Sequence, residues 1–465
     1  MTTHHDKLTR FPEGSVRELW TITLPLILAG LSGNLMIFLD RLILAHFSTD
    51  AMNAATTAGI VVALFQYGAV GISSIAEVFV GQYNGSKQKS KMGVPAWQMI
   101  WFSLMTYIVF LPLALWGGQY LLAESFMDLA MPYYQWLMFF GPSLAIFSAL
   151  AAFFIGKGKT RLVFIVTIIG NITNLVLNIA LVFGIKGWFQ PMGIKGSAIA
   201  TVISQVIMVL ILFSVFLNSN NRKTYGTKKF AFNFDEFWKC LKIGTPNSVG
   251  CMIEITAWAI ILNMIANLSN AHITVWTIAN SVFVVFAFTS NGMSKAVITI
   301  AANLIGAKKK DLVRKMMFSA IKLTLIIAAI IAIPMIIVPD LFYVAFLPQG
   351  TASIDITSIE GYIRAGLIGM WLFFLFDSLT WIFAGVFTAA GDTKFTMIMN
   401  AVSAWLFAIV PVYFWVVKGE GSPSSTCFIV AGYAMLNCFA FFLRYRTHKW
   451  KSKHVISSAE EIVEA

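Results

Sequence analysis

Long apolar stretches recur along the chain, and short polar segments separate them. Each stretch is at least about 20 residues long, which is the length that a helix needs to cross the hydrocarbon core of a bilayer. They cover approximately residues 19–46, 54–82, 93–122, 131–155, 162–185, 196–217, 240–266, 273–304, 317–347, 358–389, 395–417 and 425–444. The pattern predicts an all-α integral membrane protein with twelve transmembrane helices.

The composition excludes several other classes of protein. Apolar residues make up 58% of the chain and charged residues 12%, about half of the ~25% that is usual in a soluble domain. A soluble enzyme, a nucleic-acid binder and a disordered chain are therefore excluded. The segment Gly156–Thr160 lacks the first glycine and the spacing of a phosphate-binding loop. We expect no enzyme activity and no cofactor, and we expect the lipid bilayer as a partner.

The positive charges indicate how the chain is oriented. The net charge is +12, from 33 Lys and Arg against 21 Asp and Glu. Twenty-six of the 33 basic residues fall on the two termini and the even-numbered loops, and five fall on the odd-numbered loops. Because basic loops stay on the cytoplasmic side, both termini are predicted to be cytoplasmic. We expect a multi-pass protein of the plasma membrane, specifically the bacterial inner membrane.

The two sets of six stretches resemble each other. At an offset of 221 residues, Pro25 aligns with Pro246, and Gly85-Ser-Lys aligns with Gly306-Ala-Lys. An even number of helices precedes the second copy, so both copies start on the same side of the membrane. The pattern predicts two parallel six-helix lobes related by a pseudo-two-fold axis along the membrane normal.

The repeat divides the chain into four parts. We assign residues 1–217 to an N-lobe, 218–239 to a cytoplasmic linker, 240–447 to a C-lobe and 448–465 to a cytoplasmic tail. A cleft between the lobes is the expected place for a substrate.

One acidic residue of the N-lobe, Asp40, falls inside an apolar stretch, where an ionisable side chain is costly. Asn174 and Asn178 share one helix face at a spacing of four residues, and Thr201 lies on the next stretch. A carboxylate, two amide oxygens and a hydroxyl suit a small hard cation, or the carboxylate can hold a proton. The alternative is that these groups only join neighbouring helices by hydrogen bonds.

The C-lobe contains two acids at mid-span, Glu254 and Asp377, with no basic residue within one turn of either. Trp258 follows Glu254 by one turn, and Phe373 precedes Asp377 by one turn. Aromatic faces beside carboxylates suit a flat organic cation. We interpret these four residues as a site for a substrate or a coupling cation.

Glu77 and Lys295 are two further ionisable residues inside apolar stretches, on equivalent helices of the two halves. If these helices face each other, the pair would bridge the lobes near the cytoplasmic side and act as a gate. The alternative is that Lys295 extends to the cytoplasmic surface while Glu77 is held within its own lobe.

Several segments together make the sequence similar to the multidrug and toxic compound extrusion (MATE) family of secondary transporters. They are Leu24-Pro25, Met36–Asp40, Gly81–Gly85, Asn174–Asn178, Gly193–Thr201, Ile243–Pro246, Glu254, Gly306-Ala-Lys and Gly385–Thr393. The resemblance covers nearly the whole chain. It implies twelve helices in two V-shaped lobes. It also implies secondary active export of cationic, often aromatic compounds in exchange for Na⁺ or H⁺ by alternating access.

The resemblance also implies roles for individual residues. The set around Asp40 matches the family's N-lobe cation site, and Glu254 and Asp377 match the C-lobe acids of the NorM-like branch. Many NorM-like members carry tyrosine where this chain has Phe373, so both Na⁺ and H⁺ stay open as the coupling ion. We expect a monomer that binds small organic cations.

Two other functions stay open at the level of the sequence. A flippase for lipid-linked precursors, from the same superfamily, would line its cleft with basic residues for a pyrophosphate, whereas the intramembrane charges here are mostly acidic. A channel agrees less well with a two-lobe repeat that contains isolated acids.

Overall fold

The computed structural model describes residues 8–122, 124, 127–339, 356–453 and 455–456. Within these residues, twelve helices are long and apolar enough to cross a membrane, which confirms the number predicted from the sequence. The described chain is almost entirely helical, and one isolated β-bridge joins Ile185 to Phe189. The end of the ninth predicted stretch, residues 340–347, lies outside the described residues.

The described residues of the first half of the chain form ten α-helices. They are α1 (Val16–Phe47), α2 (Thr49–Ser73), α3 (Ala76–Gly85), α4 (Gly93–Met105), α5 (Tyr107–Pro112), α6 (Gly118–Leu121), α7 (Met127–Phe139), α8 (Gly141–Gly156), α9 (Thr160–Phe183) and α10 (Gly193–Phe216). The short helix α11 (Ser219–Tyr225) leads to the second half. That half contains α12 (Phe234–Ala266), α13 (Asn270–Gly306), α14 (Lys310–Ala332), α16 (Ile356–Ala390), α17 (Thr393–Ala404) and α18 (Ser425–Arg446).

Shorter helical segments of other types complete the crossings. In the part of the chain that the structure describes, two are 3₁₀ turns, η2 (Lys89–Lys91) and η8 (Lys449–Ser452), and four are π-helical, namely η3 (Leu113–Gly117), η5 (Ile333–Ile337), η6 (Trp405–Ile409) and η7 (Val412–Lys418). Three of the π-helical segments lie at a proline, namely Pro112, Pro334 and Pro411. A proline lacks the N–H donor and collides with the preceding turn, so the helix widens locally.

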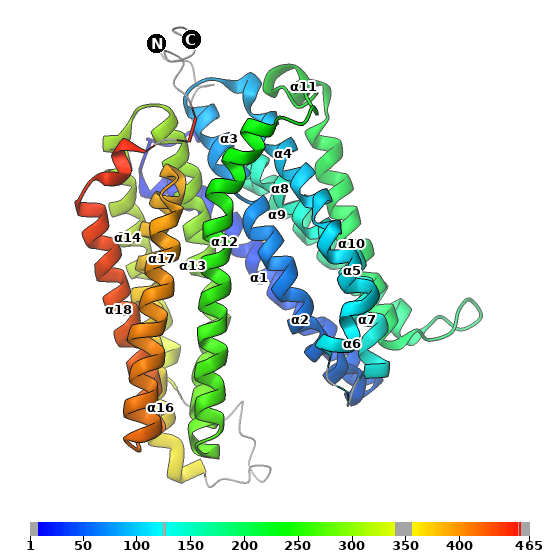
Figure 1. Cartoon of the computed structure of the whole chain (residues 1–465), viewed down its shortest axis with the longest axis vertical. Coiled ribbons are helices and arrows are strands. Elements are labelled where there is room, and N and C mark those ends of the chain that lie inside the picture. The colour runs from blue at the N-terminus through cyan, green and yellow to red at the C-terminus, as the bar shows by residue number, and fades with distance from the viewer. Residues whose placement is uncertain (1–7, 123, 125–126, 340–355, 454, 457–465) are drawn as a thin grey trace.

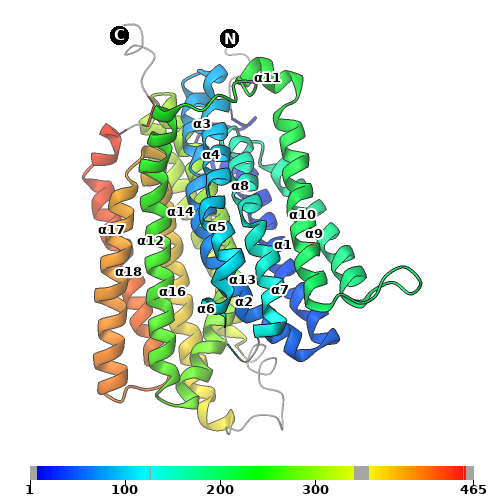
Figure 2. The same cartoon turned by 45° about the vertical axis from the view of Figure 1, so that its right-hand side comes forward.

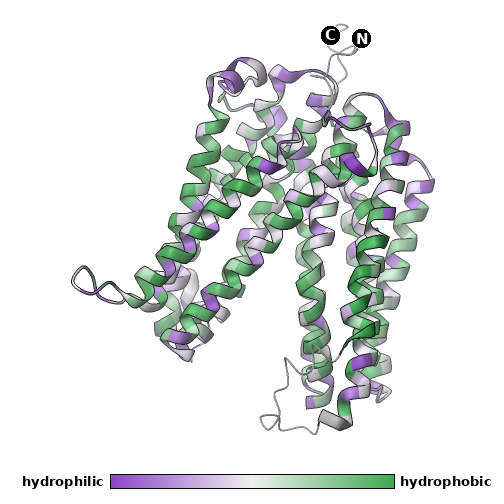
Figure 3. Cartoon of the chain, turned by 180° about the vertical axis from the view of Figure 1, so that it is seen from behind, coloured by the Kyte–Doolittle hydropathy of each residue, from purple (hydrophilic) through white to green (hydrophobic). Residues whose placement is uncertain are grey.

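The crossings gather into two lobes that diverge from one end of the molecule (Figure 1). The view from behind shows the same separation (Figure 3). A core cluster that includes Phe79 and Ile300 joins both lobes at the narrow end, whereas separate clusters around Tyr134 and Phe374 each belong to one lobe. Ile456, the last described residue, also packs into the shared cluster. We call this narrow end the closed end and the opposite end the open end.

The backbone repeats its conformation at the predicted offset of 221 residues. Ser48 and Ser269 both precede the second long helix of their lobe in extended conformation, and each hydroxyl caps the helix by accepting a backbone N–H. Lys87 and Lys308 both adopt a left-handed conformation, with φ of 62° and 60°. Such a φ is uncommon outside glycine, so its recurrence supports the internal repeat.

The lobes approach most closely where α3 crosses α13. A Cβ atom on Gly85 would lie 1.9 Å from the backbone oxygen of Asn303, and one on Gly306 would lie 2.1 Å from the backbone oxygen of Gln82. Asn84 Nδ2 also donates a 2.7 Å hydrogen bond to Asn303 Oδ1. Glycine is required at both crossing positions, because any side chain would collide with backbone.

The segment between the lobes is attached to the N-lobe through Lys157. Its Nζ donates a 3.2 Å hydrogen bond to Asn221 Oδ1 of α11 and lies 4.4 Å from the ring centroids of Phe153 and Tyr225. Burial, with a smaller contribution from Lys159, lowers the pKa of Lys157 to about 8. The second view shows α11 at the closed end, beside the top of α10 (Figure 2).

The helix α12 begins at Phe234, within the segment 218–239 that we assigned to the linker. Asn233 caps this helix, because its Oδ1 accepts a 3.0 Å hydrogen bond from the backbone N–H of Glu236. An asparagine in this position satisfies one of the free N–H groups of the first turn, so the helix starts before the apolar stretch does.

Candidate functional site

The four residues predicted as the N-lobe cation site lie together between α1, α9 and α10. Asp40, Asn174, Asn178 and Thr201 have exposed fractions of 7%, 1%, 0% and 8%. Asn178 Nδ2 donates a 2.5 Å hydrogen bond to Asp40 Oδ1, and Asn174 Nδ2 donates a 3.2 Å hydrogen bond to Thr201 Oγ1. The fold thus brings three separate segments of the sequence into one polar cluster.

Two oxygen atoms of this cluster accept no hydrogen bond from any described residue. They are the buried amide oxygens Asn174 Oδ1 and Asn178 Oδ1. A buried acceptor without a partner costs about 1–3 kcal/mol, and a hard cation is a partner that such oxygens prefer. The described residues contain no group of three or more His, Cys, Asp and Glu that could hold a metal ion. The donor set here is instead one carboxylate with neutral oxygens, and its single negative charge balances a monovalent cation.

A tyrosine that the sequence did not single out lies beside this cluster. Tyr133 of α7 is buried, and its hydroxyl lies 3.5 Å from Arg41 Nη1 as a hydrogen-bond acceptor. The Arg41 guanidinium lies 5.7 Å from the Tyr133 ring centroid, and Tyr133 also interacts electrostatically with Asp40. Hydropathy gives no signal for this contact, because it does not tell which helices pack face to face.

Two adjoining cavities lie in the C-lobe, and both Glu254 and Asp377 line each of them. The larger has a volume of about 450 Å³, and the smaller one of about 60 Å³. Aromatic rings line the larger cavity, namely Trp258, Trp276, Phe283, Phe373 and Trp381. Amides and hydroxyls line the smaller one, including Asn247, Ser294, Thr380, Thr388, Thr396, Asn400 and Asn437. The two acids therefore lie where the larger, aromatic cavity, which we call the aromatic chamber, adjoins the smaller, polar cavity.

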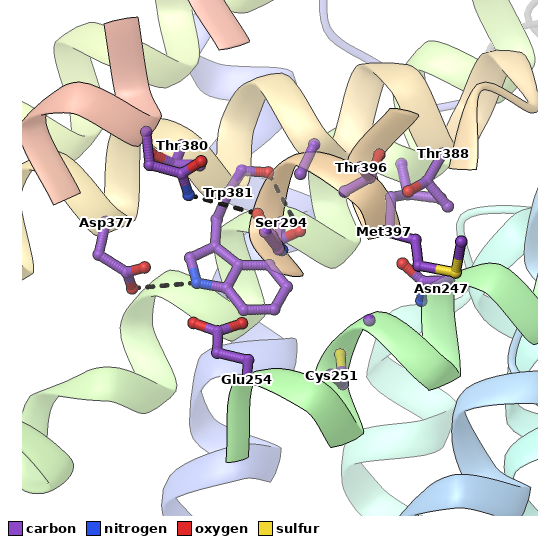
Figure 4. A pocket seen from close by; sticks show the side chains of 15 residues that line it. Asn247, Cys251, Glu254, Ser294, Asp377, Thr380, Trp381, Thr388, Thr396 and Met397 are labelled. Carbon is purple, nitrogen blue, oxygen red and sulfur yellow. Dashed lines mark hydrogen bonds between the residues drawn. The ribbon is translucent and has the colours of Figure 1, made fainter. Parts of the chain in front are cut away.

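The two acids have polar partners but no basic one among the residues that line these cavities. Trp381 Nε1 donates a 3.0 Å hydrogen bond to Asp377 Oδ2, and its indole ring lies beside both carboxylates (Figure 4). The Tyr433 hydroxyl donates a long hydrogen bond, 3.5 Å, to Glu254 Oε1. The two carboxylates are close enough to repel each other electrostatically. A positive charge between them would relieve that repulsion.

Trp258 and Phe373, the aromatic residues expected at this site, belong to a larger aromatic cluster. Their ring centroids lie 5.4 Å apart in an edge-to-face arrangement. Phe283 lies 5.0 Å from Phe373, Trp276 lies 6.3 Å from Trp258, and Tyr433 stacks on Phe373 at 6.5 Å. Trp276, Phe283 and Tyr433 could not be predicted from the sequence, because 40 Phe and 14 Trp give no contrast between lipid-facing and lobe-facing rings.

The sequence left two interpretations open for Glu77 and Lys295, an ion pair between the lobes or a lysine that extends to the cytoplasmic surface. Glu77 is 3% exposed, and its Oε1 accepts a 2.6 Å hydrogen bond from Thr299 Oγ1 of α13. Lys295 is exposed, forms no ion pair with Glu77 and attracts it only from a longer distance. Thr299 lies one helical turn nearer the closed end than Lys295, and it occupies the place that we expected for the lysine. Glu77 therefore does bridge the lobes, but through a hydroxyl.

Within the described residues, twelve helices long and apolar enough to cross a membrane, in two related lobes with polar groups buried in each lobe, are typical of a membrane transporter. The sequence matches the MatE family over residues 25–180 and 246–414, and the chain belongs to this family. The predicted resemblance is thereby confirmed.

Individual relatives agree with this assignment. The chain is 24% identical to the probable multidrug resistance protein NorM of Thermotoga maritima over 421 residues, and this alignment covers 88% of each chain. It is 23% identical over 407 residues to the probable multidrug resistance protein YoeA of Bacillus subtilis, which covers 83% of each. Both relatives are named as probable multidrug resistance proteins, and one of them carries the name NorM.

The fold also matches solved structures. One is described as an outward-facing conformation of a multidrug resistance MATE family transporter of the MOP superfamily. Its TM-score is 0.82 at 16% sequence identity, and the match covers 96% of this chain and 98% of that chain. The two-lobe architecture inferred from the internal repeat is thus found in this family of folds.

Proposed function

We propose that the protein exports cationic, aromatic small molecules in exchange for Na⁺, as a multidrug efflux antiporter that leaves its substrates chemically unchanged. The observation that carries the proposal is the pair of acids, Glu254 and Asp377, in a chamber walled by aromatic rings, with no basic residue among the described residues that line it. Relatives named as probable multidrug resistance proteins support the same function.

The larger chamber has the size and the chemistry for a flat organic cation. Its volume of about 450 Å³ lies within the ~300–1,000 Å³ that is usual for small-molecule sites. Trp258 and Phe373 offer ring faces, which attract a cation. Glu254 and Asp377 are both half-buried, and their charges add attraction for a cation. The combination favours a cation over a neutral compound of the same shape.

The N-lobe cluster supports Na⁺ as the coupling ion. Asp40 supplies one formal charge, and the unpartnered oxygens of Asn174 and Asn178 supply neutral ligands. A proton needs only the carboxylate, whereas Na⁺ would use all of these oxygens. H⁺ is the alternative coupling ion, and efflux driven by one ion gradient at a time distinguishes the two.

The shape of the molecule supports alternating access. The lobes are joined at the closed end and diverge towards the open end, as expected for one of two states in a transport cycle. If the termini are cytoplasmic in a bacterial inner membrane, as the basic loops predict, the open end faces outward. Both sites are complete within one chain, which supports transport by a monomer.

Charge argues against a flippase for lipid-linked precursors. A pyrophosphate carries negative charge, and the two acids of the C-lobe chamber would repel it. Lys295 is exposed on α13, but it does not line either C-lobe cavity. The acid-lined chamber therefore favours cations.

Ethidium efflux from proteoliposomes tests the proposal. We expect an imposed Na⁺ gradient to accelerate efflux, and an H⁺ gradient alone to have little effect. Acceleration by H⁺ alone would replace Na⁺ with H⁺ as the coupling ion. Efflux that is unchanged after both gradients are collapsed would contradict antiport altogether.

A pair of variants separates coupling from general damage. Asp40→Asn should abolish the response to Na⁺, because it removes the only formal charge in the cluster. Asp50→Asn makes the same chemical change at an exposed position of α2, and it should leave the response intact. Equal responses in both variants would exclude Asp40 from the ion site.

A further inference from the structure

Two hollows meet on the surface of the C-lobe, away from both C-lobe cavities described above. The first has a volume of about 850 Å³ and lies between α14, α16, α18 and the turn η8 at the closed end. The second, of about 570 Å³, follows one face of α14. Both are lined by Phe318 and Ile321, so they form one continuous groove. No residue of this groove lines the cavities that contain Glu254 and Asp377.

The closed end of the groove is basic. Arg314, Arg446 and Lys451 line it together with His448 and one acid, Asp311. Asp311 is bound to Lys451 at 3.2 Å, and the Asp311 side chain is fully exposed. Neither Arg314 nor Arg446 forms an ion pair within the described chain.

The two arginines lie against aromatic rings instead of acids. The Arg314 guanidinium lies 5.6 Å from the ring centroid of Phe318, and that of Arg446 lies 5.9 Å from the ring centroid of Phe442. Planar guanidinium groups bind phosphate through two parallel hydrogen bonds. Two such groups on facing helices leave their donors available to an anion.

The rest of the groove is apolar and runs along α14 away from the closed end. Leu325 and Ile326, on this face, are 47% and 46% exposed. Lys322, which also lines the second hollow, is exposed and lies eight residues beyond Arg314, or about 12 Å along the helix. A lysine at that depth reaches back towards the headgroup region with its long side chain.

From this arrangement we infer that the groove binds an anionic phospholipid of the bilayer. The phosphate lies between Arg314 and Arg446, and an acyl chain follows Phe318, Ile321 and Leu325 along α14. Basic pockets between transmembrane helices at the headgroup level have the chemistry that selects such lipids. The groove combines a basic end and an apolar end in the order in which a bilayer lipid presents its own headgroup and chain.

Native mass spectrometry of the purified transporter tests the inference, with long-chain phosphatidylglycerol and phosphatidylethanolamine as the added lipids. We expect phosphatidylglycerol to bind at least about tenfold more tightly, since basic residues near a membrane surface favour anionic lipids. Equal binding of the two lipids would overturn the inference. Glycerol phosphate, which has the anion but no chain, should bind at least about tenfold more weakly than phosphatidylglycerol. Equal binding of glycerol phosphate would show an anion site and no lipid site.

Matched variants place the site on the protein. Arg314→Gln with Arg446→Gln should lower the affinity for phosphatidylglycerol by about tenfold or more. Arg161→Gln with Arg222→Gln removes the same charge from exposed positions of α9 and α11 at the closed end, and it should leave the affinity unchanged. An equal loss of affinity in both double variants would contradict a lipid site at Arg314 and Arg446.

The chain's own acidic tail is the competing occupant. Residues 457–465 contain Glu460, Glu461 and Glu464, which carry the charge that the two arginines attract. Removal of these nine residues should leave the binding of phosphatidylglycerol unchanged. If the truncation raised the affinity for phosphatidylglycerol by tenfold or more, the tail would be the occupant of the groove and the proposed lipid site would be wrong. The comparison of lipids on the unaltered protein stands even if one variant fails to fold.

Discussion

Thr299 of α13 donates a 2.6 Å hydrogen bond to Glu77 of α3, and this bond joins the two lobes in their common buried core. Both residues lie on the two helices that cross closely at Gly85 and Gly306. The bond forms only while the lobes are together at the closed end. Under the alternating access that we propose, the bond belongs to one of the two states and adds to the stability of that state alone.

Thr299→Val should shift the protein away from the state described here. A hydrogen bond to a charged group contributes about 1.5–3 kcal/mol, so its loss changes the ratio of the two states by roughly thirtyfold. Cys251 provides the readout, because it lines both C-lobe cavities and is half-buried, whereas Cys240, Cys427 and Cys438 are buried. We expect slower labelling of Cys251 by a maleimide added from the open side.

Thr167→Val is the matched control for Thr299→Val. The Thr167 hydroxyl bonds only to the backbone of its own helix, at Val163, so its loss should not change the balance of the two states. If both variants label at the rate of the unaltered protein, the bond between Thr299 and Glu77 does not select a state.

Gly85→Ala should disrupt the closed end. Its Cβ atom would lie 1.9 Å from the backbone oxygen of Asn303, so α3 and α13 must move apart. Overpacking of this kind usually costs about 1–3 kcal/mol, and we expect a lower midpoint of thermal unfolding together with slower labelling of Cys251. Gly432→Ala is the control, since nothing lies within 4 Å of the added atom. It should be neutral, or stabilising by about 0.5–1 kcal/mol. Equal effects of the two variants would contradict the importance of the crossing.

The sequence predicted the helices and the internal repeat because both depend on local patterns. Apolar length gives the crossings, and the offset of 221 residues recurs in the left-handed conformations of Lys87 and Lys308. The polar cluster of Asp40, Asn174, Asn178 and Thr201 could be predicted because polar side chains within apolar stretches are rare. Partners that depend on how two helices are rotated against each other, such as Thr299 for Glu77, could not.

The aromatic site was predicted only in part for the same physical reason. Trp258 and Phe373 were found because each lies one turn from an acid on its own helix. Trp276 and Tyr433 reach the site from other helices, and no pattern within one helix marks them. Packing between lobes and helices decides which of many similar rings face inward.

Asn174→Leu should weaken the Na⁺ dependence of transport. The substitution keeps a similar volume but removes the unpartnered Oδ1 that we propose as a ligand. We expect the Na⁺ concentration for half-maximal efflux to rise at least about tenfold, as for the loss of a ligand-supporting group at a metal site. Asn171→Leu removes an amide one turn away that bonds to Ser32 instead, and its Na⁺ dependence should stay unchanged. Unaltered Na⁺ dependence in Asn174→Leu would remove the amide oxygen from the ion site and favour H⁺ at Asp40.

Neutral substitutions of the C-lobe acids should reduce the binding of cations more than that of neutral compounds. Attraction between unit charges at about 4 Å is worth between about 1 kcal/mol in water and about 4 kcal/mol near a protein surface. Glu254→Gln and Asp377→Asn should therefore each weaken the binding of ethidium by about tenfold, and that of an uncharged aromatic of similar size by much less. Equilibrium binding to the purified protein measures both, with the exposed Glu420→Gln as the control. Because Trp381 bonds to Asp377, Asp377→Asn also tests whether the indole keeps its place, which the fluorescence of the tryptophans would report. An equal loss for the charged and the uncharged compound would mean that the two acids only support packing.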